Sequence, residues 1–213
     1  MTPAEIVTNV KSLALMGAMG TSADDVKVYR FVNISISRVY EKVAAKYPWA
    51  VQEFQDVAIV NGEGTMADEP LHILGVRDAN NGYEPLDATD VGSAQEDDPG
   101  LDATGTPEEY WQVGKDGLRT HPRNDTTAQV SFTPLPETVT SSSTEDDLFL
   151  PSVFHEVYVW ETLKLMAYDE RDKIVGAELA FNEKEYNDCY DRIWRHYDAK
   201  APQKQKQVTR YIA

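Results

Sequence analysis

The sequence predicts an α+β protein in which two helices precede, and two helices follow, a small, mainly antiparallel β module. Apolar residues recur at helical spacing before residue 48 and after residue 150, whereas the stretch between them has the shorter period of strands. Turn sequences interrupt this middle stretch repeatedly. We therefore expect N-terminal helices over 1–48, a β insertion over 49–147, C-terminal helices over 148–198 and an extended tail over 199–213.

The first predicted helix begins at a capping box formed by Thr2 and Glu5, with Pro3 at its first position, and continues to about Met16. After a break, acidic residues open a second helix over 22–47, where they are favourable at a helix N-terminus. Pro48 ends this helix because a proline disfavours helical geometry in the residue before it.

The β insertion is predicted from short runs of β-branched and aromatic residues separated by turns. The clearest hairpin has two such runs around the turn at 114–117. The predicted strands are Val51–Val60, Leu71–Val76, Tyr110–Val113, Leu118–Thr120 and Thr127–Phe132.

Two stretches of the insertion lack these patterns. Glu84–Thr106 is rich in Asp, Gly and Ala and poor in aromatic residues, so we expect a long exposed loop. Thr138–Asp147 contains three consecutive serines and is predicted to be a linker that returns the chain to the helices.

The stretch Leu150–His196 predicts a helical hairpin. Its first helix opens near Pro151 and carries two apolar stripes, which implies cover on more than one side. Tyr168–Asp172 is a polar break, and two helices joined by a short polar link usually pack antiparallel. The only cysteine, Cys189, lies beside the apolar stripe of the second helix and is expected in the core.

Composition restricts the functional classes. The 213 residues carry a net charge of −16, which argues against binding to a phosphate backbone, because that requires clustered lysine and arginine. No apolar run is long enough to span a membrane, and no secretory signal is visible at the N-terminus. The sequence therefore predicts a protein that is made in the cytoplasm.

Searches for chemical motifs predict neither catalytic residues nor a cofactor. His155–Glu156 resembles half of a zinc-protease motif, but the second histidine would fall on Val159. A calcium loop that began at Asp87 would have Val91 at a ligand position, and valine has no side-chain oxygen; the solvated loop is favoured over weak calcium binding. Paired carboxylates occur, but an acidic chain contains such pairs by chance. No metal site is predicted.

Four segments, in order, resemble head–tail connector adaptor proteins of tailed bacteriophages. The main match is Leu150–Trp160, which contains a "leucine, proline, two residues, phenylalanine, histidine, glutamate" run. The other segments are Gly105–Trp111, Thr120–Pro122 followed by Ala128–Phe132, and Asp169–Lys173 before a long helix. The chain departs from the family in the acidic stretch Glu84–Thr106 and in a first strand without the usual Thr-Ala-Gly sequence.

The resemblance implies a four-helix bundle with the β insertion between its second and third helices. It implies a non-enzymatic virion protein in the phage neck: a ring, of about twelve copies, between the portal and the next neck or tail completion protein. Genomic DNA would pass through the ring without specific binding, since a wall with few cations gives phosphates nothing to pair with. By location, the tail residues that match a portal-docking segment are Lys200, Lys204, Lys206, Arg210 and Tyr211.

Two other functional classes remain open from the residues. One is a different structural virion protein, such as a tail or baseplate component. The other is an unrecognised hydrolase or metal-binding domain.

Overall fold

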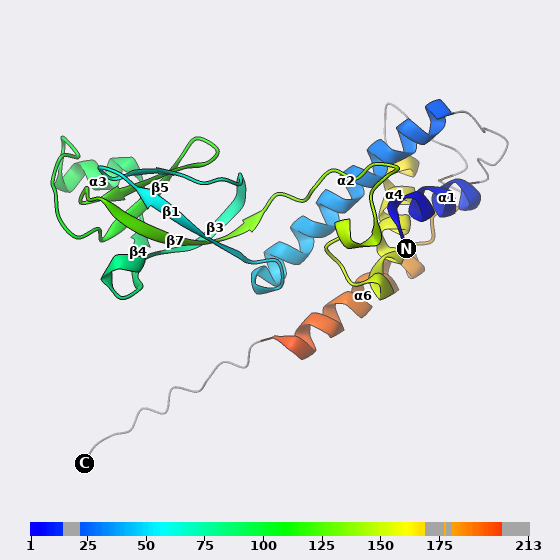
Figure 1. The fold of residues 1–213 in the computed structure, drawn as a ribbon. Helices are drawn as coiled ribbons and strands as arrows, with labels where there is room; N and C mark the ends of the chain where they lie inside the picture. Colours follow the sequence, from blue (N-terminus) through cyan, green and yellow to red (C-terminus); the bar gives the residue numbers. More distant parts are fainter. Residues whose placement is uncertain (15–21, 169–176, 178–179, 202–213) are drawn as a thin grey trace, which may run out of the picture. The chain divides into compact units, whose positions relative to one another are not determined.

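The computed structural model describes residues 1–14, 22–168, 177 and 180–201 (Figure 1). The chain divides into two compact units, which we call the helical unit and the barrel unit. The helical unit contains Met1–Val39 and Thr138–Ala213, and the barrel unit contains Tyr40–Glu137. The barrel unit is thus one continuous stretch of sequence, whereas the helical unit is assembled from both ends of the chain.

The helical unit contains the helices α1 (Pro3–Leu13), α4 (Glu156–Tyr168) and α6 (Glu183–Lys200), together with most of α2 (Ser22–Lys46). The predicted capping box is present at α1: the Thr2 hydroxyl accepts from the Glu5 amide, and the Glu5 carboxylate accepts from the Thr2 amide. Asn182 caps α6 by accepting hydrogen bonds from two amides of its first turn.

Helix α4 organises the helical unit because it packs against both α1 and α6. It also contacts α2, where the Thr162 hydroxyl donates to Ser35 Oγ over 3.0 Å, and both groups are buried. Among the apolar residues predicted to form a stripe on this helix, Val157 and Ala167 are buried as expected. Val153 is 68% exposed, because it lies in a short 3₁₀ helix, η5 (Ser152–Phe154), before α4 begins.

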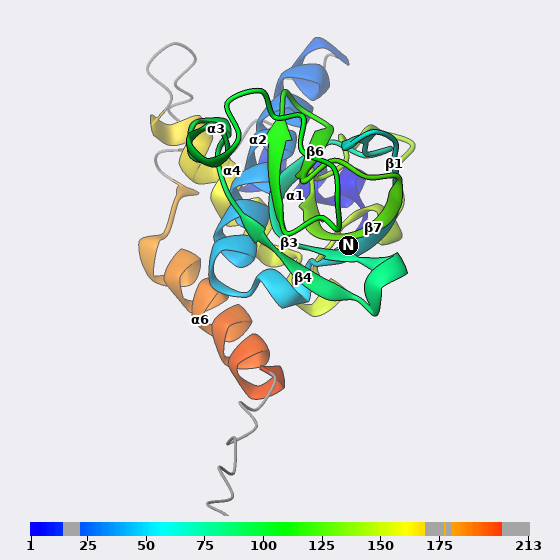
Figure 2. The same ribbon diagram turned by 90° about the vertical axis from the view of Figure 1, so that its left-hand side faces the viewer.

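The barrel unit contains a seven-stranded sheet with the order β1-β7-β3-β4-β5-β6-β2. Figure 2 labels β1, β3, β4, β6 and β7 of this sheet. All neighbouring pairs are antiparallel except β4 and β5, which are parallel. The turn at Asn61 and Gly62 brings β2 back beside β1, where Val60 bridges Glu63, so the sheet is nearly closed. The strands are β1 (Glu53–Ile59), β2 (Glu63–Thr65), β3 (Pro70–Asp78), β4 (Glu84–Ala88), β5 (Glu109–Val113), β6 (Gly117–His121) and β7 (Thr126–Pro134).

Alternation along the strands fills the barrel interior. In β7 the buried positions Ala128, Val130 and Phe132 alternate with half-buried polar ones. Val57 and Ile59 of β1, and Met66 directly after β2, belong to the same core. Gly64 is required where β2 approaches β1, because a Cβ there would lie 2.5 Å from the Ile59 side chain and 3.0 Å from the Ala58 carbonyl oxygen.

The expectation of a four-helix bundle with a small, mainly antiparallel β insertion is wrong. The fold is α+β, with a nearly closed, mixed seven-stranded barrel in the middle of the chain and helices in its N-terminal and C-terminal parts. Two strands were missing from the prediction. β2 has only three residues, and β4 has one buried side chain, Leu86, so neither shows an alternating apolar pattern.

The acidic stretch Glu84–Thr106 is therefore not one long loop. It forms β4 and a short helix, α3 (Val91–Asp97), which begins at Asp90 with a side-chain cap. Ala94 and Leu101 pack against Trp111 of β5 in a small core of their own. The expected insertion spans 49–147, whereas the barrel unit spans 40–137. Among the helices within the described residues, none has the length and apolar character that a membrane crossing requires.

Candidate functional site

The run that resembles phage adaptors forms a junction in the helical unit. His155, at its centre, is fully buried. Its Nε2 lies 2.6 Å from the Leu150 carbonyl oxygen and its Nδ1 lies 2.8 Å from the Met1 carbonyl oxygen. A carbonyl oxygen only accepts, so the contact with Leu150 is a hydrogen bond donated by an Nε2–H, whereas Nδ1 also lies 3.2 Å from the Met1 amino nitrogen, which can donate to it. The ring therefore ties the entry of α4 to the first residue of the chain.

The neighbours of His155 connect the same junction to α6. The Phe154 ring packs edge-on against the His196 ring, with 4.9 Å between centroids. The Glu156 carboxylate accepts from the Arg192 guanidinium over 2.7 Å and from the Trp160 indole N–H over 3.4 Å. The run thus joins the start of α1, the start of α4 and the last turns of α6 through the side chains of Phe154, His155 and Glu156.

A buried carboxylate, Glu161, lies one turn further along α4. The hydroxyls of Tyr186 and Tyr190, both on α6, donate to its Oε2 over 3.0 Å and 2.6 Å. Burial, followed by the adjacent Glu161 charge, raises the pKa of the Tyr190 hydroxyl above its ordinary value. Sequence analysis missed this group, although one glutamate inside an otherwise apolar helix face was a signal that could have found it.

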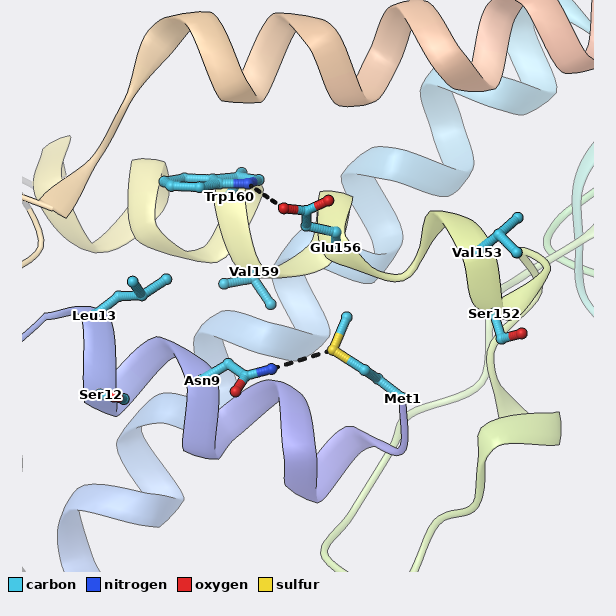
Figure 3. A pocket seen from close by; sticks show the side chains of 9 residues that line it. All are labelled: Met1, Asn9, Ser12, Leu13, Ser152, Val153, Glu156, Val159 and Trp160. Atoms are coloured by element: carbon cyan, nitrogen blue, oxygen red, sulfur yellow. Dashed lines mark hydrogen bonds between the residues drawn. The ribbon is translucent and has the colours of Figure 1, made fainter.

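A groove of about 430 Å³ opens between α1 and α4 (Figure 3). Leu13 lies at one end of the view and Val153 at the other, with Val159 and Trp160 between them along α4. Asn9 and Met1 meet across the groove, where the Asn9 amide donates to the Met1 sulfur. The lining mixes apolar side chains with the polar Asn9, Ser12, Ser152 and Glu156, so the groove offers another segment both apolar contact area and hydrogen-bond partners.

The barrel unit contains one histidine–carboxylate pair, between β6 and the turn after α3. His121 Nε2 lies 3.0 Å from Asp98 Oδ2. A hydrogen bond from the Ala103 amide, followed by the one to His121, lowers the pKa of the Asp98 carboxyl below its ordinary value. The adjacent cavity, of about 10 Å³, holds no more than one water molecule, and the contacts of Asp98 with His121 and with the Ala103 amide fix the turn after α3.

The predicted docking residues are only partly described. Lys200 is the exposed last residue of α6, whereas Lys204, Lys206, Arg210 and Tyr211 lie outside the described residues. The grouping of these five residues at a docking surface therefore stays a prediction. Cys189 is buried, as predicted.

Metal ligation finds no support in the described part of the chain. Within it, no three His, Cys, Asp or Glu side chains are grouped so that they could hold an ion. The stretch weighed as a calcium loop, Asp87–Asp98, forms the end of β4 and the helix α3 instead of a loop that encircles an ion.

The charge of the two units is unequal. The barrel unit contains 19 acidic residues against six lysines and arginines, a net charge of −13, whereas the helical unit contains 17 against 14, a net charge of −3. Neither a scan against models of known protein families nor a search of curated proteins finds a match to this chain.

Proposed function

We propose that this chain is a structural virion protein of a tailed bacteriophage, without catalytic activity. It acts as a head–tail connector adaptor: a ring subunit, in about twelve copies, between the portal and the next neck or tail completion protein. The ring forms part of the channel through which genomic DNA enters and leaves the head. Its place in the particle is the neck.

The observation that carries this proposal is the structural use of the run Leu150–Glu156, the segment most similar to the adaptor family. His155 is enclosed and bonded on both ring nitrogens, and Glu156 is paired with Arg192. His155 and Glu156 are both used to join helices, and this structural use supports a subunit that assembles.

The charge distribution supports the same proposal. Duplex DNA that moves through a channel is retarded by cations that pair with its phosphates. The barrel unit, with a net charge of −13, offers few such cations. We therefore propose that the barrel unit contributes to the channel wall and that DNA passes it without specific binding.

The tail provides the proposed contact with the portal. After Asp198 the chain contains no acidic residue, and Lys200, Lys204, Lys206 and Arg210 are followed by Tyr211. A cationic segment with an aromatic anchor suits an acidic docking surface, where charge guides the encounter and the aromatic ring supplies contact area.

Co-assembly with a portal protein of the same virus tests the proposal. The full-length chain is mixed with purified portal rings, and the particles are imaged by electron microscopy. We expect an added ring on one face of the portal. A chain that leaves the portal rings unchanged, or that is located in the tail or baseplate of the virion, contradicts the adaptor assignment.

A charge-reversed tail separates the docking claim from the assembly claim. Lys204→Glu combined with Lys206→Glu should weaken portal binding at least tenfold, measured by co-sedimentation at low salt. The matched control is Lys184→Glu, which reverses one exposed charge in the first turn of α6 and should bind normally. Unchanged portal binding by the tail variant would contradict the docking role of the tail. It would not contradict ring formation, which electron microscopy tests separately.

A further inference from the structure

The groove between α1 and α4 presents apolar side chains that the described part of the chain leaves uncovered. Leu13 is 44% exposed at one end, and Val153 is 68% exposed at the other. Between them along α4, Trp160 is half-buried and Val159 is buried at the groove wall, so the exposed apolar surface lies mainly at the two ends (Figure 3). Apolar surface arranged along a groove in this way is typical of a site that receives a peptide segment.

One end of this groove is acidic. Ser152 and Met1 line it, and both contact Glu145, the first residue of the 3₁₀ turn η4 (Glu145–Asp147). All three residues of that turn are acidic and exposed. Glu156 adds a fourth carboxylate to the groove wall, but it binds Arg192. Glu145 binds the Met1 amino group, so the excess negative charge of this end comes from Asp146 and Asp147. A segment that enters from this end would gain from carrying positive charge.

The end of α6 lies at the same end of the groove. His196 packs on Phe154, which is adjacent to the groove residue Val153, and Arg192 binds the groove residue Glu156. Lys200 follows His196 by one helical turn. Ala201 then leaves the helix with a ψ of 134°, as expected for a residue before Pro202, so the chain can turn away from the helix axis there.

We propose that residues 203–213 of the same chain occupy this groove in the free protein. Val208, Tyr211 and Ile212 have the i, i+3, i+4 spacing of a peptide that lays one apolar face into a groove. Lys204, Lys206 and Arg210 match the acidic end. Twelve residues after Ala201 span up to about 40 Å, whereas α1 is only about 16 Å long, so the segment can run from Val153 to Leu13.

This inference goes beyond the proposed function and does not depend on it. It concerns the free chain, and it holds or fails whether or not a portal is the partner. If the tail occupies the groove and also docks on the portal, the portal must displace the tail from the groove before it can bind the tail.

Cysteine cross-linking in the full-length chain tests the placement. Leu13→Cys combined with Ile212→Cys should form an intramolecular disulfide under mild oxidation at least ten times faster than the matched pair Val26→Cys and Ile212→Cys. Val26 is 72% exposed and lines a second groove, on the α1–α2 side, so it controls for random encounters and for the alternative site. Equal rates, faster reaction with Val26, or a covalent dimer as the main product would overturn the proposal.

Limited proteolysis provides a second readout that does not require a covalent bond. Trypsin cuts after the tail cations, and intact mass spectrometry follows the loss of the tail. Leu13→Asp combined with Val153→Asp should speed this loss at least fivefold, whereas Val26→Asp should not change it. All three positions are exposed, so the variants are expected to fold, which circular dichroism checks. An unchanged rate in the double variant would contradict occupation of the groove.

Discussion

The helical unit and the barrel unit are stabilised in different ways. In the helical unit, single buried polar side chains join helices that are far apart in sequence: His155 reaches Met1, Thr162 reaches Ser35, and Glu161 binds two tyrosines of α6. In the barrel unit, backbone ladders join the strands, and the interior is filled by alternating apolar side chains. The stability of the helical unit therefore depends on a few particular polar side chains. The stability of the barrel unit depends on the alternation of apolar side chains along the strands and on close approach of neighbouring backbones.

The largest effect is expected at His155. His155→Ala leaves a cavity in the helical unit and removes the donor for the Leu150 carbonyl oxygen, so the free energy of unfolding should fall by about 3 kcal/mol. Urea denaturation followed by Trp160 and Trp194 fluorescence reports on this unit, and Trp49 and Trp111 report on the barrel unit. His72→Ala, an exposed barrel position, is the control. A loss below 1 kcal/mol, or an equal loss in both units, would contradict the comparison.

The corresponding weak point of the barrel unit is a glycine. Gly64→Ala places a Cβ against Ile59, Val57 and the Ala58 carbonyl, so β2 must move away from β1, at a cost of about 2 kcal/mol. Gly105→Ala is the matched control, because its Cβ would approach no atom closer than 3.7 Å. Hydrogen exchange of the barrel amides should rise in the first variant only. If both variants behave alike, close approach at Gly64 does not limit barrel stability.

Alkaline pH should weaken the helical unit more steeply than the barrel unit. Burial raises the pKa of Tyr158, Tyr190 and Tyr197 above the ordinary 10.0, so each remains protonated in the folded state after the unfolded chain has lost its proton. The unfolded state then binds fewer protons, and the free energy of unfolding falls as pH rises above about 10, by up to ~1.4 kcal/mol per pH unit for each tyrosine. The barrel unit contains fewer such groups among its described residues: Tyr40, whose pKa is raised to about 12, and Tyr110.

Tyr190→Phe isolates one contribution to this slope. The variant lacks the hydroxyl that titrates, so the free energy of unfolding of the helical unit should fall less steeply between pH 10 and 12, by the contribution of one tyrosine. At neutral pH the variant should be less stable than the parent, because Glu161 loses a hydrogen-bond donor. Exposed Tyr168→Phe is the control. If Tyr190→Phe leaves the slope of the free energy of unfolding against pH unchanged, this tyrosine has the same pKa in the folded and unfolded states.

The smallest effect concerns salt. The barrel unit repels itself with a net charge of −13, so raising sodium chloride from 0.05 M to 0.5 M should stabilise it by up to about 1 kcal/mol through screening. The helical unit, at −3, should change less. Thermal unfolding followed with the two pairs of tryptophans measures both. An equal shift in the two units would show that charge does not distinguish them.

Sequence reasoning found the helices because their signals are local. The capping box at Thr2 and Glu5 and the apolar repeat of α4 are contained within a few turns. It also placed strands at β1, β3, β5, β6 and β7. It missed β2 and β4 because closure of a barrel depends on pairing between distant short segments, which leaves little pattern in either one.

The candidate site was predictable to a smaller extent. The Leu150–Glu156 run was identified, and the structure gives His155 a structural role in place of the half metal site that its sequence suggests. The groove could not be predicted, because it forms where α1 meets α4, and the sequence separates them by more than 140 residues. The docking role of the tail stays a prediction.

The division of the chain also has a consequence for its synthesis. The barrel unit is continuous in sequence, so it can complete its contacts on the ribosome once residue 137 has emerged. The helical unit cannot, because α1 and α2 pack on α4, which is translated only after the whole barrel. The apolar faces of α1 and α2 therefore stay without this partner during more than half of translation, because α2 ends at Lys46 and α4 begins only at Glu156.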